Sequence, residues 1–169
     1  MSYQKPYKGL KVIDFSQGVA GPYCSMLLAQ YGAEVIKVEP KEGDWARNLG
    51  QEYGEHSAFS VAANLGKKSI IVDLKNTKSQ PILDKIIKQA DIFIEGFRPG
   101  VIKRLGYDYD RVKKINPMLI YLSISGFGQN GPMSYKPAMD PVLQAFTGFM
   151  SENKGPDDIP HRTPVIIFD

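Results

Sequence analysis

The sequence predicts an α/β protein with a mostly parallel, doubly wound sheet covered by helices on both faces. Apolar runs of strand length alternate with stretches of helical periodicity, so that strand follows helix along the chain. A strand, a helix and a second strand follow one another within residues 10–38, and such a unit places its strands parallel with a right-handed crossover. The 169 residues are enough for one domain with a hydrophobic core.

Turn and cap residues delimit these elements. The first strand, at 10–15, ends at the turn-prone Ser16-Gln17-Gly18, and Pro22 suits the first turn of a helix that Gly32 ends. Asn76 or Thr77 can cap a helix with an apolar stripe at 82–87. Further strands are expected at 33–38, 69–74, 91–95, 119–124 and 164–169, and further helices at 58–63, 101–105, 109–115 and 139–150.

Composition and charge restrict the classes of protein to consider. A net charge of +3 is too small and too scattered for a nucleic-acid-binding surface. The N-terminus lacks the apolar segment of a signal peptide, no apolar run approaches the roughly 20 residues that cross a bilayer, and Cys24 is the single cysteine. We therefore expect a cytoplasmic protein. The apolar end at 164–169 favours a partial sequence, because natural termini are more often polar and frayed.

In an open parallel sheet, ligands bind beyond the carboxyl ends of the strands. Glycine-containing loops follow several of the predicted strands there, and glycine allows backbone amides to approach a ligand closely. A phosphate-rich ligand would suit the basic residues expected near this edge, which are Lys75, Arg98, Lys103, Arg104 and Lys136.

Each of these features also has a purely structural explanation. The arginines could be solvated surface groups, Phe97 could be core, Asp140 could begin a helix and Asp169 could cap a strand end. The sequence contains no Gly-x-Gly-x-x-Gly motif, P-loop or metal-ligand cluster, so neither NAD nor a metal is expected. His56 and His161 are isolated and are interpreted as loop residues, and Cys24 as a packed helix residue.

An ordered series of short segments goes further than composition. They are Gly9-Leu10-Lys11-Val12-Ile13-Asp14-Phe15, Ala20-Gly21-Pro22, Gly32-Ala33-Glu34-Val35-Ile36-Lys37-Val38-Glu39, Gly43-Asp44, Lys67-Lys68-Ser69-Ile70, Arg98-Pro99-Gly100, Arg104-Leu105-Gly106 and Ser123-Ile124-Ser125-Gly126-Phe127-Gly128. As a set, the chain resembles the opening of the family III CoA-transferases, the group of formyl-CoA transferase, carnitine CoA-transferase and the α-methylacyl-CoA racemases.

This resemblance implies a Rossmann-like fold, with residues 1–169 as the N-terminal portion of the CoA-binding large domain. In the family the chain leaves through a small domain and returns, and two such rings interlock as a homodimer. We expect the small domain and the returning segment to be absent here, and residues 1–169 alone to be inactive. The implied substrates are an acyl-CoA and a small carboxylic acid, with no nucleic acid or membrane as partner.

The resemblance also implies roles for particular positions. The residue matching the catalytic aspartate is Asp169, and Asp140 matches an acidic position expected to orient it. The positions that match the CoA-binding residues are Val19, Ala20, Val72, Asp73, Leu74, Lys75, Gly96, Phe97, Arg98, Arg104, Lys136, Pro137, Ala138 and Met139.

Two alternatives remain open beside the transferase. In the racemase branch a histidine that transfers a proton would align with Met139, and because a thioether cannot do this, that branch is disfavoured. The second alternative is a non-catalytic CoA-binding fragment, which the expected truncation favours. Formyl-CoA transferase has a glutamine at Val19, a basic residue at Pro40 and a tyrosine at Met139, and these departures count against the formyl/oxalate substrate pair.

Overall fold

A computed structural model describes residues 5–168 of the chain. It divides into two compact units, Met1–Ile124 and Ser125–Asp169.

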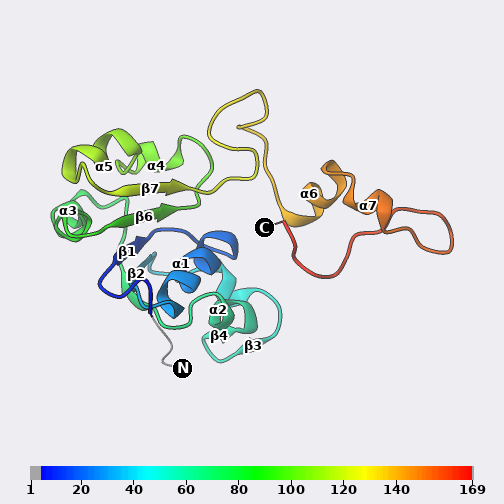
Figure 1. Cartoon of the computed structure of the whole chain (residues 1–169), viewed down its shortest axis with the longest axis horizontal. Helices are drawn as coiled ribbons and strands as arrows, with labels where there is room; N and C mark the ends of the chain where they lie inside the picture. Colours follow the sequence, from blue (N-terminus) through cyan, green and yellow to red (C-terminus); the bar gives the residue numbers. More distant parts are fainter. Residues whose placement is uncertain (1–4, 169) are drawn as a thin grey trace. The chain divides into compact units, whose positions relative to one another are not determined.

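The first unit is built on a five-stranded sheet in the order β5-β2-β1-β6-β7 (Figure 1). All neighbouring strands of this sheet are parallel, as predicted. The strands are β1 (Lys11–Asp14), β2 (Glu34–Glu39), β5 (Lys68–Ile71), β6 (Ile92–Glu95) and β7 (Ile120–Ser123). The chain builds outward from β1 on one side and then returns to add β6 and β7 on the other, so the order reverses beside β1, as in a doubly wound sheet.

Helices cover both faces of the sheet. The helical elements of the first unit are α1 (Ala20–Gln30), η1 (Trp45–Asn48), α2 (Ala58–Ala62), η2 (Thr77–Ser79), α3 (Gln80–Lys88), α4 (Val101–Arg104) and α5 (Tyr109–Ile115). Side chains of α1 pack with Val12, Val35 and Ile94 on one face. Side chains of α3, α4 and α5 pack on the other face around Phe15 and Phe93. These helices fall close to the predicted ranges.

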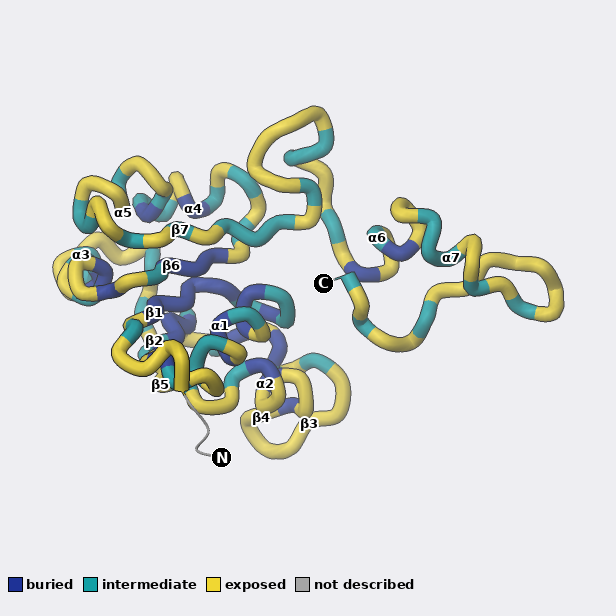
Figure 2. The backbone as a smooth tube through the Cα atoms, in the orientation of Figure 1, coloured by how far each residue is buried: buried dark blue, intermediate teal, exposed yellow. Residues whose placement is uncertain are grey.

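The core of the first unit depends on alternation along its strands. Val12 and Ile13 face opposite clusters, as successive strand residues must. Phe93 is fully buried, with its ring centroid 4.7 Å from that of Phe15 and 4.9 Å from that of Tyr121. Dark blue in Figure 2 marks this burial along the central strands.

A small antiparallel hairpin, which the sequence did not predict, joins η1 to α2. It pairs β3 (Glu52–Tyr53) with β4 (His56–Ser57). Ser57 then begins α2 through a capping box, in which its hydroxyl accepts from the Ser60 amide while the Ser60 hydroxyl accepts from the Ser57 amide.

The second unit contains two short helices, α6 (Asp140–Phe146) and α7 (Phe149–Glu152). The single helix predicted at 139–150 is therefore wrong, because Gly148 between them has a φ of 80° and ends the helical path. The strand predicted at 164–169 is also wrong over its described residues, 164–168, which form no strand and are exposed or half-buried. Their backbone groups bind side chains of α6 instead of a neighbouring strand.

None of the helices in the described residues is long and apolar enough to span a lipid bilayer.

Candidate functional site

The carboxyl ends of the parallel strands lie along one edge of the first unit, and loops with predicted site residues follow three of them. Val19 precedes the first residue of α1, Ala20, in the loop after β1. The segment 72–75 follows β5, and the segment 96–98 follows β6. Because β1 and β6 are neighbours, the first and third of these loops begin side by side at the reversal of strand order.

Buried carboxylates shape the loop after β1. Asp14 Oδ1 accepts from the Ser16 amide at 2.9 Å, and Asp44 Oδ1 accepts from the Gly18 amide at 2.8 Å. Lys37 Nζ donates to the Ser16 carbonyl at 2.9 Å and pairs with Asp44 Oδ2 at 2.8 Å. The loop that leads to Val19 is therefore held by side chains of two strands and of the loop after β2.

The loop after β6 is held in a similar way by Glu95, which the sequence did not single out. One Glu95 oxygen accepts from the Phe97 amide at 2.9 Å, and the other accepts from the Ser123 hydroxyl. Burial raises the pKa of Glu95, and these two hydrogen bonds oppose that shift. A Cβ at Gly96 would lie 3.3 Å from Ser16 Cβ, so a glycine here permits the two loops to approach closely.

The predicted contact residues of the first unit differ in exposure. Val72, Leu74 and Phe97 pack partly against the apolar cluster around Phe93. Arg98 and Arg104 are exposed, and neither forms an ion pair with any described residue. The structure thus combines half-buried apolar groups with uncommitted cations beyond the strands, an arrangement that can hold an anionic ligand with an apolar part.

The remaining predicted residues lie in the second unit. Met139 is 66% exposed, and the Lys136 ammonium lies 5.5 Å from the centroid of the Tyr135 ring. A Cβ at Gly126 would lie 2.0 Å from Ala138 Cβ, so the chain segments on either side of the loop 127–137 pack together at this point. The assembly of residues 136–139 with the loops of the first unit into one binding site stays a prediction.

Asp140 is buried at the start of α6. Its Oδ1 accepts from the backbone amides of Ile167 and Phe168, both at 2.7 Å, and its Oδ2 accepts from Gln144 Nε2 at 2.5 Å. Burial raises its pKa, but these hydrogen bonds outweigh burial and hold the pKa of Asp140 below its ordinary value. Asp140 therefore binds the backbone immediately before Asp169, which itself lies outside the described residues.

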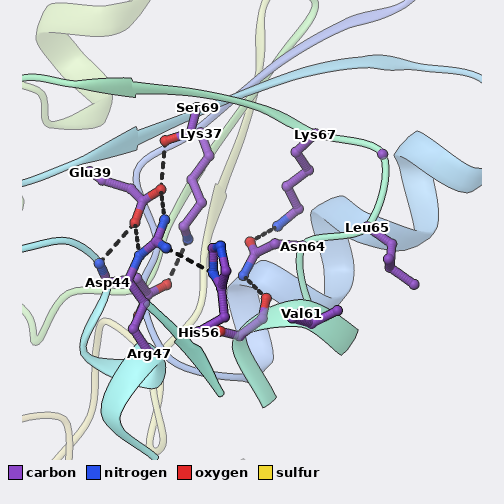
Figure 3. Close-up of a pocket in the computed structure, with 12 residues that line it drawn as sticks. Lys37, Glu39, Asp44, Arg47, His56, Val61, Asn64, Leu65, Lys67 and Ser69 are labelled. Carbon is purple, nitrogen blue, oxygen red and sulfur yellow. Dashed lines mark hydrogen bonds and ion pairs between the residues drawn. The ribbon is translucent and has the colours of Figure 1, made fainter. Parts of the chain in front are cut away.

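A cavity of about 290 Å³ lies elsewhere in the first unit, beside β2, β5 and α2 (Figure 3). None of the predicted site residues lines it. Arg47 forms a bidentate pair with Glu39 at 2.8 and 3.0 Å, and its guanidinium donates to His56 Nδ1 at 3.0 Å. Lys67 Nζ lies within 3.1 Å of Asp14, Asn64 and the Pro22 carbonyl.

The three cations around this cavity, Lys37, Arg47 and Lys67, thus already have acidic partners. We interpret the cluster as a brace for the loops after β1 and β2 rather than as a ligand site. Burial lowers the pKa of Lys67 to about 8, and the like charge of Lys37 adds to this effect. The signal in the sequence was a set of charged residues within apolar strands, such as Lys37 and Glu39, which must be paired if they are buried.

Comparison with known proteins decides the family. Residues 7–169 match the model of CoA-transferase family III. The chain belongs to CoA-transferase family III.

Curated relatives support the assignment to this family. The chain is 42% identical over 158 residues to the acetyl-CoA:oxalate CoA-transferase of Acetobacter aceti. This alignment covers 93% of the chain and 41% of the relative. The chain is 39% identical over 152 residues to the human succinyl-CoA:glutarate CoA-transferase, covering 89% of this chain and 35% of the relative. Both relatives are named for the transfer of CoA between acids.

Solved structures of the family share the fold. A CAIB/BAIF family protein from Brucella suis superposes with a TM-score of 0.89 at 36% identity, over 95% of this chain and 44% of that one. The hypothetical protein Rv3272 of Mycobacterium tuberculosis superposes with a TM-score of 0.87 at 35% identity, over 96% of this chain and 45% of that one. The chain spans less than half the length of these relatives.

Two further properties of this family III chain bear on its chemistry. Burial, followed by the nearby charge of Asp14, raises the pKa of the Cys24 thiol, so Cys24 is not an activated nucleophile. Within residues 5–168, no group of three or more His, Cys, Asp or Glu side chains could hold a metal ion.

Proposed function

We propose that the full-length protein transfers coenzyme A from an acyl-CoA to a free carboxylic acid, and that this chain contributes CoA-binding loops and the nucleophile Asp169. The observation that carries the proposal is the pair of uncommitted, exposed arginines, Arg98 and Arg104, beyond the carboxyl ends of the strands in a family III chain. An enzyme that handles CoA must bind several phosphate charges, and guanidinium groups without an acidic partner suit that task.

In the proposed complex, different loops at this edge contact different parts of the CoA molecule. The amides and side chains at 72–75 and 96–98 contact the adenosine, with the half-buried Phe97 against the purine ring. Arg98, Arg104 and Lys75 neutralise phosphates. Val19 and Ala20 line the route of the pantetheine arm toward the acyl group.

The proposed reaction proceeds through covalent intermediates on Asp169. A carboxylate oxygen of Asp169 attacks the thioester carbonyl carbon, the new C–O bond forms, and the C–S electron pair leaves with CoA as the thiolate. The thiolate then attacks the aspartyl carbonyl of this mixed anhydride and releases the donor acid as its carboxylate. The acceptor carboxylate reacts with the resulting aspartyl-CoA thioester by the same two steps in reverse. Protons are not consumed, and the free energy of the thioester is retained throughout.

Asp140 acts in this scheme as a positioning group. Its carboxylate binds the amides of Ile167 and Phe168, so it orients the nucleophile through the backbone rather than through its side chain. The hydrogen bonds that lower the pKa of Asp140 keep it ionised, and an ionised carboxylate accepts such bonds more strongly than a neutral group.

The relatives suggest which acids to test. The names of several contain oxalate or glutarate as the acid and acetyl-CoA, succinyl-CoA or formyl-CoA as the donor. We propose that the acceptor here is a small dicarboxylic acid as well. The full-length protein is to be assayed with these three donors against oxalate and glutarate, with α-proton exchange in D₂O measured in parallel to detect racemase chemistry.

The decisive experiment is Asp169→Ala in the full-length protein. We expect turnover to fall by about 10⁴-fold or more while CoA still binds, and the acyl or CoA adduct that mass spectrometry traps on the wild-type peptide to disappear. The matched control is Asp157→Ala, an exposed aspartate of the same unit, which should retain full activity. Transfer that persists in Asp169→Ala would refute the assignment of the nucleophile.

A further inference from the structure

The second unit has an unusual distribution of buried residues. Among its described residues, 125–168, the buried side chains are those of Asp140 and Gln144, and both are polar. Gln144 is fully buried one helical turn after Asp140 on α6. Neighbouring apolar residues of this unit, including Val142, Phe146 and Ile167, are exposed. A polar pair therefore occupies the interior position that an apolar cluster holds in the first unit.

The side chain of Gln144 binds both Asp140 and the segment 163–168. Its Oε1 accepts from the Thr163 amide at 2.9 Å. Its Nε2 donates to Asp140 Oδ2 at 2.5 Å and to the Val165 carbonyl at 3.3 Å. Together with the two amides bound by Asp140, the pair engages the backbone of 163, 165, 167 and 168.

These partners fix the orientation of the Gln144 amide. Its oxygen must face Thr163, because the Thr163 amide can only donate. Its nitrogen must face Asp140 and Val165, because a carboxylate and a carbonyl can only accept. A flipped amide would oppose donor to donor and acceptor to acceptor in a buried position, which is costly. Gln144 is therefore a specific connector between the carboxylate of Asp140 and the segment 163–168.

The segment depends on this connector because little else holds it. Residues 164–168 form no strand, and the side chains of Val165 and Ile167 are 64% and 47% exposed. Apolar contact contributes through the edge-on approach of Phe168 to Phe149, with ring centroids 5.6 Å apart. Polar bonds rather than packing thus determine the path of the chain up to the residue before Asp169.

We propose that Gln144 is a positioning residue for the nucleophile: its amide locks Asp140 and the segment 163–168 together and so sets where Asp169 meets the thioester. The inference rests on the proposed function. A covalent reaction is sensitive to such placement, because a displacement of about 1 Å can cost on the order of 100-fold in rate. Gln144 does not touch the substrate in this role, so it should affect the chemical step without affecting CoA binding.

The test compares variants of the full-length protein with the donor and acceptor pair that the wild type turns over fastest among acetyl-, succinyl- and formyl-CoA with oxalate or glutarate. Gln144→Glu keeps the size and shape of the side chain but places a second carboxylate against that of Asp140. We expect kcat and the rate of adduct formation to fall about 30-fold, with KM for the acyl-CoA within about twofold of wild type. Gln89→Glu, the same change at an exposed position, is the control and should leave both constants unchanged.

Two further variants separate positioning from general stability. Asp140→Asn combined with Gln144→Glu restores a donor opposite an acceptor, and we expect it to regain about fivefold or more of the kcat lost in Gln144→Glu. Thr163→Pro removes the backbone N–H that donates to Gln144 Oε1, and the change lies in a partly exposed segment. We expect kcat to fall about threefold at unchanged KM. This variant keeps the test decisive if Gln144→Glu fails to fold.

The outcomes distinguish this inference from the proposed function. Wild-type kcat in a folded Gln144→Glu, or in Thr163→Pro if Gln144→Glu does not fold, would overturn the role of Gln144. A folded double variant no more active than Gln144→Glu would do the same. If Asp169→Ala is inactive in the same series, the failure concerns Gln144 alone. If Asp169→Ala still transfers CoA, the proposed function itself fails.

Discussion

The two units of this chain are stabilised in different ways. In the first, two clusters of buried apolar side chains pack the sheet against its helices, and buried charges such as Asp14 and Lys37 are paired with opposite charges. In the second, two buried polar side chains bind the backbone of an irregular segment. Apolar packing is strong but non-directional, whereas hydrogen bonds are weaker and directional. The first unit is therefore suited to stability, and the second to placing one short segment.

The largest expected effect lies in the first core. Phe93→Ala should destabilise the protein by about 4 kcal/mol, because it removes a fully buried ring and leaves a cavity between Phe15 and Tyr121. Urea unfolding measures this loss. Phe146→Ala changes an exposed ring of the second unit and should cost much less stability. An equal loss in the free energy of unfolding would contradict the difference between the two units.

Buried charge should come next. Lys37→Met leaves Asp44 buried without its cation, and we expect a loss of about 3 kcal/mol in the free energy of unfolding. The matched control is Lys68→Met, which removes the cation of an exposed pair with Glu34 on the same sheet and should leave stability unchanged. Equal effects of the two changes would show that the buried network is not a brace.

Acid should weaken the first unit through Glu39. Burial raises its pKa, but hydrogen bonds from Arg47, Ser69 and the Asp44 amide lower it from 4.5 to about 2. Between these values the unfolded chain binds more protons than the folded one. The stability that Glu39 contributes is therefore complete above pH 4.5 and is lost as the pH falls toward 2, by at most about 3 kcal/mol.

Urea unfolding of wild type and Glu39→Gln across this pH range tests the assignment. The two proteins should differ most at pH 6 and converge toward pH 2, since a protonated glutamate resembles glutamine. A difference that is the same at every pH would remove Glu39 as the source of the acid sensitivity.

The smallest expected effect is local to the second unit. Asp140→Asn keeps an acceptor for the Ile167 and Phe168 amides but can turn its own NH₂ group toward Gln144 Nε2. We expect these two amides to exchange hydrogen roughly 10-fold faster, equivalent to about 1.4 kcal/mol, while amides of β1 are unaffected. Faster exchange of the β1 amides as well would show instead that the two units are energetically coupled.

Sequence reasoning predicted the first unit better than the second, for a physical reason. Apolar periodicity places a strand such as Ile92–Glu95 or a helix such as Gln80–Lys88, because burial of alternate or every third and fourth residue is a local property of the sequence. The run Val165-Ile166-Ile167-Phe168 has the composition of a strand, but no neighbouring strand pairs with it in the second unit, and its backbone binds Asp140 and Gln144 instead.

The candidate site was predictable only in part. Parallel strands bring the loops at 19–20, 72–75 and 96–98 to one edge, whatever the order of the strands. The residues that hold these loops could not be identified, because the pairing of Lys67 with Asp14, for example, depends on the order of the strands in the sheet. Gln144 gave no signal at all, since a lone glutamine on a helix is ordinarily solvated.

The strand order has a consequence for synthesis on the ribosome. β1 bonds to β2 on one side and to β6 on the other, and the contact between Lys11 and Asp91 spans 80 positions. The N-terminus leaves the ribosome first, so β1, β2 and β5 can assemble early. One side of β1 then lacks a neighbouring strand until β6 leaves the exit tunnel. During that interval the nascent sheet presents an apolar strand with free amides and carbonyls to other nascent chains, a state that chaperones protect.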